Sequence, residues 1–218
     1  FVMSPFDEQA IEGALRVREA LGTAKVTLLC MGSELARGIV KDGLSLGADE
    51  AVLLVDETFE EADSYTTALT LAAAIEKIGE VDLILTGRQA ADWDAGVVGC
   101  GIAEILSLPA VTLAKALELR EGLVRVERVL DDGIETVEAP LPAVVTISHE
   151  LGAPRHASLR ETMRAARKPL TVWNASDLGL ASTQVGGRGA RRVLERLYIP
   201  VNDVVCEFIK GDTPEALA

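Results

Sequence analysis

Four short runs of apolar residues, without polar alternation, constrain the fold of this chain more than any other feature. They cover residues 25–30, 51–55, 81–86 and 142–147. A continuous apolar run is typical of a strand that is buried on both faces. Segments of helical period separate these runs, over residues 34–46, 66–78 and 94–106. The alternation predicts an α/β fold with a doubly wound, mostly parallel sheet and right-handed crossovers.

The first helix, predicted to end at Leu21, carries its own start and stop signals. Ser4 stands at the N-cap position and Pro5 at the first helical position, and Asp7 completes a pattern that resembles a capping box. Gly22 is a typical C-cap. Phe6 has two interpretations on this pattern: a hydrophobic staple, or an aromatic face placed against a flat ring.

Composition and charge exclude several classes of function. The net charge is −13, which argues against nucleic acid or an anionic membrane as the main partner. No apolar run reaches the ~18 residues of a membrane span, so we expect no membrane insertion. The three cysteines (Cys30, Cys100 and Cys206) have neither disulfide-framework nor metal-site spacing, which favours a reducing, cytoplasmic compartment. No set of catalytic residues and no metal site is predicted.

Two regions depart from the alternating pattern. Turn signals at Gly122 and at residues 131–133 predict an antiparallel hairpin addition within residues 111–137. After Pro169 the chain is rich in glycine, serine and asparagine, so we expect residues 1–169 to form the α/β domain. Residues 170–218 are expected to form an extended arm that packs on another chain, with a disordered tail as the alternative.

The segment 87–99 follows a predicted strand and opens a predicted helix. At such a turn, backbone amides and a helix N-terminus can hold phosphate. Its glycines allow a close approach to the backbone. Arg88 offers a phosphate contact, and Asp92 or Asp94 can accept from ribose hydroxyls or cap the helix. The segment matches neither the dinucleotide fingerprint nor the P-loop, so an ordinary strand–helix turn remains an alternative.

A locally basic segment covers residues 154–168 of this acidic chain. Such a run is usually a solvated helix face. Here Leu159 and Met163, spaced at i and i+4, also offer an apolar anchor among charged neighbours that include Arg160 and Arg164. This composition is typical of a docking patch.

Four ordered segments carry a resemblance to a known family. They are Ser-Pro-Phe-Asp-Glu at 4–8, Gly-Ala-Asp at 47–49, Gly-Arg-Gln-Ala-Ala-Asp-Trp-Asp at 87–94, and the run 126–146 with its Asp-Asp-Gly turn at 131–133. The last run continues into Pro-Arg-His-Ala-Ser-Leu at 154–159, which is similar to the family's partner-recognition loop. In this combination the chain resembles the β subunit of electron-transfer flavoprotein along almost its whole length.

The resemblance implies a Rossmann-like fold of the adenine nucleotide α hydrolase-like type. It also implies pairing with an α subunit that carries the redox-active FAD. The heterodimer would take electrons from acyl-CoA or related dehydrogenases. The β site binds AMP in some members, whereas electron-bifurcating members hold there a second FAD that accepts hydride from NADH.

By position, the resemblance assigns the cofactor-binding residues Phe6, Met31, Gly32, Gly87, Arg88, Gln89, Ala90, Ala91, Asp92, Asp94, Gly96, Val97, Val98 and Gly99. It assigns the partner contacts Leu159, Arg160, Met163 and Arg164. Phe6 is expected to approach the flavin of the α subunit, and Met31 and Gly32 to border the adenine. The arm after residue 169 is expected to wrap onto the α subunit.

The chain also departs from the family pattern. AMP-binding members have Asn-Gln-Thr where this chain has Gly96-Val97-Val98, which favours FAD slightly over AMP. The family's first strand is absent before Phe1, so we expect native residues to be missing there. One alternative function is a stand-alone nucleotide-binding or stress-sensing domain. Another is a related ATP-cleaving enzyme, which would need a Ser-Gly-Gly-type phosphate loop near the first strand.

Overall fold

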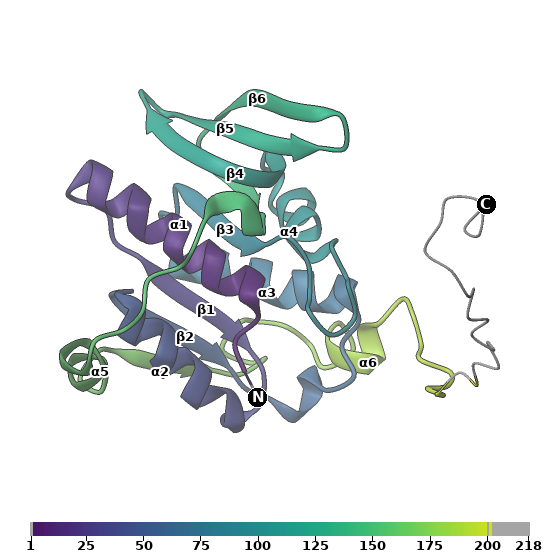
Figure 1. Ribbon diagram of the computed structural model, residues 1–218. Helices are drawn as coiled ribbons and strands as arrows, with labels where there is room; N and C mark the ends of the chain where they lie inside the picture. Colours follow the sequence, from purple (N-terminus) through teal and green to yellow (C-terminus); the bar gives the residue numbers. More distant parts are fainter. Residues whose placement is uncertain (1, 200, 202–218) are drawn as a thin grey trace, which may run out of the picture.

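Two sheets lie side by side in the centre of the computed structural model, which describes residues 2–199 and 201 (Figure 1). The first sheet is parallel, in the order β1 (Thr27–Met31), β2 (Glu50–Leu54) and β8 (Leu170–Trp173). The second has the order β3 (Leu83–Gly87), β7 (Ala143–Ile147), β4 (Ala110–Arg120), β5 (Leu123–Leu130) and β6 (Gly133–Pro140). Its first three strands are parallel, whereas β4, β5 and β6 form an antiparallel meander.

Helices cover both faces of the sheets (Figure 1). One face carries α1 (Pro5–Leu21) and α2 (Arg37–Leu46), and α5 (Leu159–Ala165) packs against α2. The other face carries α3 (Ser64–Ile78) and α4 (Val98–Leu106). Single turns complete the order: η1 (Glu34–Ala36), η2 (Glu57–Phe59), η3 (His149–Leu151) and α6 (Gly186–Gly189). The predicted α/β class and mostly parallel sheet are confirmed.

Helix α1 forms as its sequence signals predict. The Ser4 hydroxyl accepts from the Phe6 backbone amide at 3.2 Å. At the other end, Gly22 has a φ of 75°, and its amide donates to the Arg18 carbonyl. A left-handed φ is adopted most readily by glycine, so this residue can end the helix without strain.

In the described residues no hydrogen-bonded ladder joins β1 to β3. The two sheets are connected instead by α1 and α3, each of which packs on both. On α1, Ala10 packs into the core of the five-stranded sheet and Leu15 into that of the three-stranded sheet. On α3, Ala68 packs into the core of the five-stranded sheet and Ala74 into that of the three-stranded sheet. β1 and β3 are mostly half-buried, whereas β7 is fully buried. Apolar side-chain packing, not backbone pairing, therefore sets the relative position of the sheets.

The four predicted strands and both hairpin turns are present, but the helix predicted from Asp94 begins only at Val98. Asp94 has a φ of 50°, a left-handed conformation that interrupts an α-helix. The N-cap residue is Val97, which makes no side-chain cap hydrogen bond. Neither Asp92 nor Asp94 therefore caps this helix.

Residues 170–190 differ from the expected arm because they pack onto this chain. β8 hydrogen-bonds to β2 as a third parallel strand. Ala175 and Val185 are buried beside Phe59 of η2. The following residues, 191–199, have no regular structure and are exposed. The rest of the predicted arm, including Cys206, lies outside the described residues apart from Val201.

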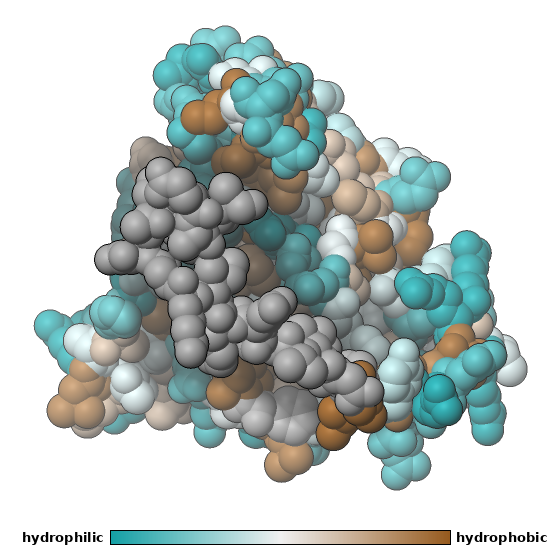
Figure 2. Space-filling model, turned by 45° about the vertical axis from the view of Figure 1, so that its right-hand side comes forward, coloured by the Kyte–Doolittle hydropathy of each residue, from teal (hydrophilic) through white to brown (hydrophobic). Residues whose placement is uncertain are grey.

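The meander of β4, β5 and β6 projects from the domain and is mainly hydrophilic in Figure 2. Its outer strand β6 is exposed at six of its eight positions. Within residues 2–199 and 201, no helix has the length and apolar character needed to cross a bilayer.

Substitution of Gly99 in α4, compared with substitution of Gly38 in α2, tests how closely α4 packs on the sheet. A Cβ on Gly99 would lie 2.6 Å from Thr86 Oγ1 and 2.9 Å from Thr146 Cγ2. Gly38, also the second residue of its helix, would meet nothing within 4 Å. We predict that Gly99→Ala lowers the free energy of unfolding by about 1–3 kcal/mol in urea titrations. Gly38→Ala should raise it by up to about 1 kcal/mol. Equal effects would contradict the packing.

Candidate functional site

The candidate site lies where the carboxyl ends of the parallel strands meet the N-terminus of α1. β1 ends at Met31 and β3 at Gly87, and Ile147 ends the neighbouring strand β7. Ligands of open α/β sheets bind at this edge, where loops and helix N-termini converge. Most of the predicted cofactor residues lie at this edge or in the loop that leaves it.

Gly87 allows α1 to approach the end of β3 closely. A Cβ on this residue would lie 2.8 Å from Phe6 Cβ and 2.9 Å from Asp7 Oδ1. Desolvation raises the pKa of Asp7, and a hydrogen bond from the Gly87 backbone lowers it, with a net shift upward. The structure therefore brings Phe6 and Gly87 together, although they are far apart in sequence.

Arg88 extends this cluster toward β7. Its amide donates to the Ile147 carbonyl at 2.9 Å, and its guanidinium carbon lies 5.2 Å from the centre of the Phe6 ring. Its Nη1 is 3.5 Å from the Ser148 hydroxyl. Among the described residues it has no carboxylate within ion-pair distance. The guanidinium is thus held beside an aromatic ring and keeps donors for an anion.

The loop after Arg88 is shaped by its own hydrogen bonds. The side-chain amide of Gln89 donates to Asp94 Oδ1 at 2.7 Å. The Ala90 backbone amide donates to the Ala95 carbonyl at 3.2 Å. The side chains of Gln89 and Asp94, which were predicted to bind cofactor, therefore hold the turn together in this structure. A Cβ on Gly96 would lie 3.3 Å from the Arg88 carbonyl.

The remaining residues of the loop are either exposed or begin helix α4. Ala91 and Asp92 are exposed, and Asp92 accepts from the Trp93 amide at 2.9 Å. Trp93 is 60% exposed and Val97 is 55% exposed. Val98 and Gly99 open α4, whose first amides have no side-chain cap. The loop therefore offers backbone donors and exposed apolar surface side by side.

Met31 and Gly32 lie at the end of β1, on the same edge. The Gly32 amide donates to the Leu54 carbonyl at 3.0 Å, which ties this turn to β2. Burial, together with the charge of Asp7, raises the pKa of the neighbouring Cys30 thiol to about 11. Cys30 thus stays a neutral thiol at neutral pH and keeps this wall apolar.

The arrangement suits a flat ring with an anionic tail. Phe6 supplies apolar contact, Arg88 supplies a positive charge, and the uncapped start of α4 supplies backbone donors, whereas Met31 packs partly on the core. An adenine nucleotide carries both of these chemical groups. Within the described part of the chain, no group of three or more His, Cys, Asp or Glu residues is placed to hold a metal ion.

Ser148 and Glu150 lie next to Arg88 at the candidate site, and the sequence alone did not indicate them. Ser148 is buried directly after β7, and its hydroxyl donates to Glu150. This hydrogen bond lowers the pKa of Glu150, and the nearby charge of Arg88 lowers it further. One signal was available: β7 and β3 are parallel neighbours, so residues that follow both strands share one edge.

The predicted partner contacts lie on α5, across the molecule from α4 (Figure 1). Leu159 is 79% exposed and Met163 is 68% exposed. Arg160 is exposed beside them, and Arg164 pairs with Glu161 at 3.1 Å. The structure thus separates these residues from the candidate cofactor site.

Comparison with known proteins identifies the family. The model of the electron transfer flavoprotein domain matches residues 1–178. The caffeyl-CoA reductase-Etf complex subunit CarD of Acetobacterium woodii is 36% identical over 217 residues, which cover 100% of this chain and 83% of that protein.

Two relatives named electron transfer flavoprotein subunit beta are also similar over most of this chain. That of Thermoanaerobacterium thermosaccharolyticum is 36% identical over 217 residues, with 99% of this chain and 83% of the relative covered. That of Megasphaera elsdenii is 33% identical over 205 residues, with 91% and 76% covered. The chain therefore belongs to the electron transfer flavoprotein β-subunit family.

Proposed function

We propose that this chain binds an adenine nucleotide at the sheet edge and pairs with an FAD-carrying α subunit to shuttle electrons from acyl-CoA-type dehydrogenases. The convergence of Phe6, Gly87 and Arg88 carries this proposal, because two parts of the sequence that are far apart, the start of α1 and the end of β3, meet there. The free thiols of Cys30 and Cys100 favour a cytoplasmic setting.

We favour FAD over AMP in the β site. Gly96 and Val97 bring no hydroxyl to the loop, and Val97 is largely exposed, so the loop offers room and apolar surface beside its backbone donors. An isoalloxazine ring needs such surface, whereas AMP ends at its phosphate. With FAD here, the heterodimer would oxidise NADH and divide the electron pair by bifurcation.

In this function the protein positions the nucleotide, and bound FAD supplies the capacity to take up and release electrons. Arg88 would bind the phosphate charge, and the amides at the start of α4 would orient it. Phe6 would exclude water from the face turned toward the α subunit.

Loss of Arg88 should weaken nucleotide binding. A hydrogen bond to a charged group contributes about 1.5–3 kcal/mol, so Arg88→Ala should raise the dissociation constant about 10- to 100-fold. Equilibrium dialysis of the heterodimer against FAD and, separately, AMP measures the change. Arg125→Ala, on the exposed face of β5, is the control and should leave binding unchanged. Equal binding by both variants would contradict the assignment of Arg88.

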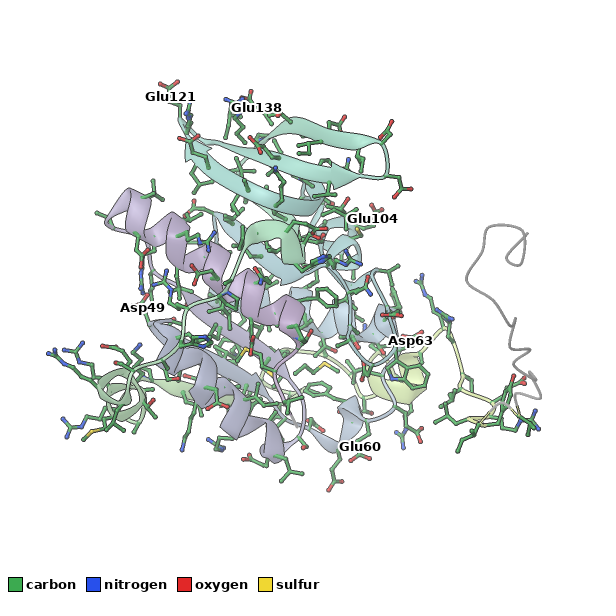
Figure 3. The ribbon with its side chains drawn as sticks, viewed as in Figure 1. Asp49, Glu60, Asp63, Glu104, Glu121 and Glu138 are labelled. Carbon is green, nitrogen blue, oxygen red and sulfur yellow. The ribbon has the colours of Figure 1, made fainter. Side chains whose placement is uncertain are left out.

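Residues 193–199, which we call the arm segment, are the proposed contact with the α subunit. Val193, Leu197 and Ile199 are 84%, 71% and 93% exposed. The root of this segment is fixed, because Asp63 Oδ2 accepts from the amides of Arg191 and Arg192 at 2.8 and 3.0 Å (Figure 3). Exposed apolar side chains on a fixed root are typical of an interaction surface.

Charges in the arm segment should prevent pairing with the α subunit. Burial of one large apolar side chain contributes about 1.5–3 kcal/mol. We therefore predict that Leu197→Asp with Ile199→Asp weakens heterodimer formation at least about 100-fold in light-scattering titrations. The unfolding midpoint of the isolated chain should not change. Ile134→Asp, on the exposed strand β6, should pair normally. Unchanged pairing of the double variant would contradict this role.

The exposed pair on α5 is the proposed contact with a dehydrogenase. Leu159 and Met163 supply apolar area, and Arg160 and Arg164 supply positive charge on a chain that is acidic overall. A buried anchor surrounded by charges supports a short-lived encounter of defined orientation.

A further inference from the structure

A linker without regular secondary structure, residues 152–158, leads from the edge of the sheet to α5. None of its residues is fully buried. Apolar packing therefore does little to fix its path, although it carries the chain to the exposed Leu159 and Met163. Other interactions must hold it.

Helix α1 supplies these interactions from one face. Glu12, Arg16 and Glu19 are spaced at i, i+4 and i+7, so they lie above one another on the helix surface. Arg16 Nη1 donates to the Leu151 carbonyl at 2.9 Å, directly before the linker. Arg155, in the middle of the linker, bridges the two carboxylates.

The bridge made by Arg155 uses both its side chain and its backbone. Its Nε lies 2.8 Å from Glu12 Oε2, and its backbone amide donates to the same oxygen at 3.2 Å. Its Nη1 lies 2.6 Å from Glu19 Oε1. We call the set Glu12, Arg16, Glu19 and Arg155 the linker clamp.

The buried end of the linker clamp makes it specific. The Glu12 side chain is only 7% exposed and is also paired with Arg16 at 2.7 Å. Burial raises the pKa of Glu12, but hydrogen bonds from Arg155 and Arg16 outweigh it and hold the pKa below its usual value. A buried carboxylate needs such partners, so the linker has one strongly favoured position.

The far end of α5 has a separate anchor. Ala165 is buried in the core under α2, and Lys168 Nζ donates to the carbonyls of Leu44 and Ala48 at 2.9 and 2.6 Å. The seven-residue helix is thus held at its C-terminal end by the core and at its N-terminal end by the linker clamp. Its two exposed apolar side chains lie between these supports.

We propose that Arg155 is a positioning residue that orients the Leu159–Met163 pair for a dehydrogenase through its bridge to Glu12 and Glu19. The inference rests on the proposed docking role of α5 and adds the element that sets its geometry. Arg155 itself stays behind the docking surface, because its side chain is turned to α1 and is 30% exposed.

The test uses the complete heterodimer with a purified short-chain acyl-CoA dehydrogenase and its acyl-CoA substrate. Arg155→Ala should raise the KM for the heterodimer about tenfold and leave kcat within twofold. It should also accelerate hydrogen exchange of the amides of residues 155–165. Arg155→Lys, which keeps the charge but cannot reach both carboxylates equally, should restore part of the KM.

Two further variants make the outcomes distinguishable. Arg120→Ala removes an ion-paired arginine on the distant hairpin and should change neither KM nor exchange. Leu159→Ala should raise KM without faster exchange. If Leu159→Ala has no effect on KM, the docking surface is wrong and the positioning role falls with it. If Leu159→Ala raises KM but Arg155→Ala does not, only the positioning role is overturned.

Discussion

The packing of helix α1 across two sheets is the constraint on which the other features depend. Ala10 and Leu15 of this one helix enter the cores of different sheets, which share no backbone ladder in the described residues. The same helix begins against Gly87, where it brings Phe6 to the candidate site. Its polar face holds Arg155 and the path to α5. A shift of α1 would therefore disturb the core, the candidate site and the position of α5 together.

Close backbone approach, achieved by glycine, sets the geometry of the candidate site. Gly87 admits the first turn of α1, and Gly99 admits α4 against Thr86 and Thr146. Both helices begin at the same edge as the strand ends, where the first amides of α4 have no side-chain cap and the Arg88 guanidinium lies beside Phe6 of α1. Helix N-termini at this edge are where α/β proteins commonly bind anions.

Local sequence signals predicted the regular elements, but they could not predict contacts between residues far apart in the sequence. The caps at Ser4 and Gly22 and the four apolar runs predicted elements that the structure confirms. The start of α4 was misplaced because the left-handed φ of Asp94 depends on the loop's own hydrogen bonds. β8 was missed because two of its four residues are exposed and the other two are only part-buried. The bridge from Arg155 to Glu12 joins residues 143 positions apart, which no local pattern indicates.

The nucleotide content of the heterodimer tests the central claim most directly. The chain would be purified with its α subunit and denatured, and the released nucleotides would be identified by chromatography and mass. We predict two adenine nucleotides per heterodimer, both FAD. One FAD with one AMP would keep the site and overturn the choice of FAD. A single FAD with no second nucleotide would contradict the claim that the edge around Phe6, Gly87 and Arg88 is a cofactor site.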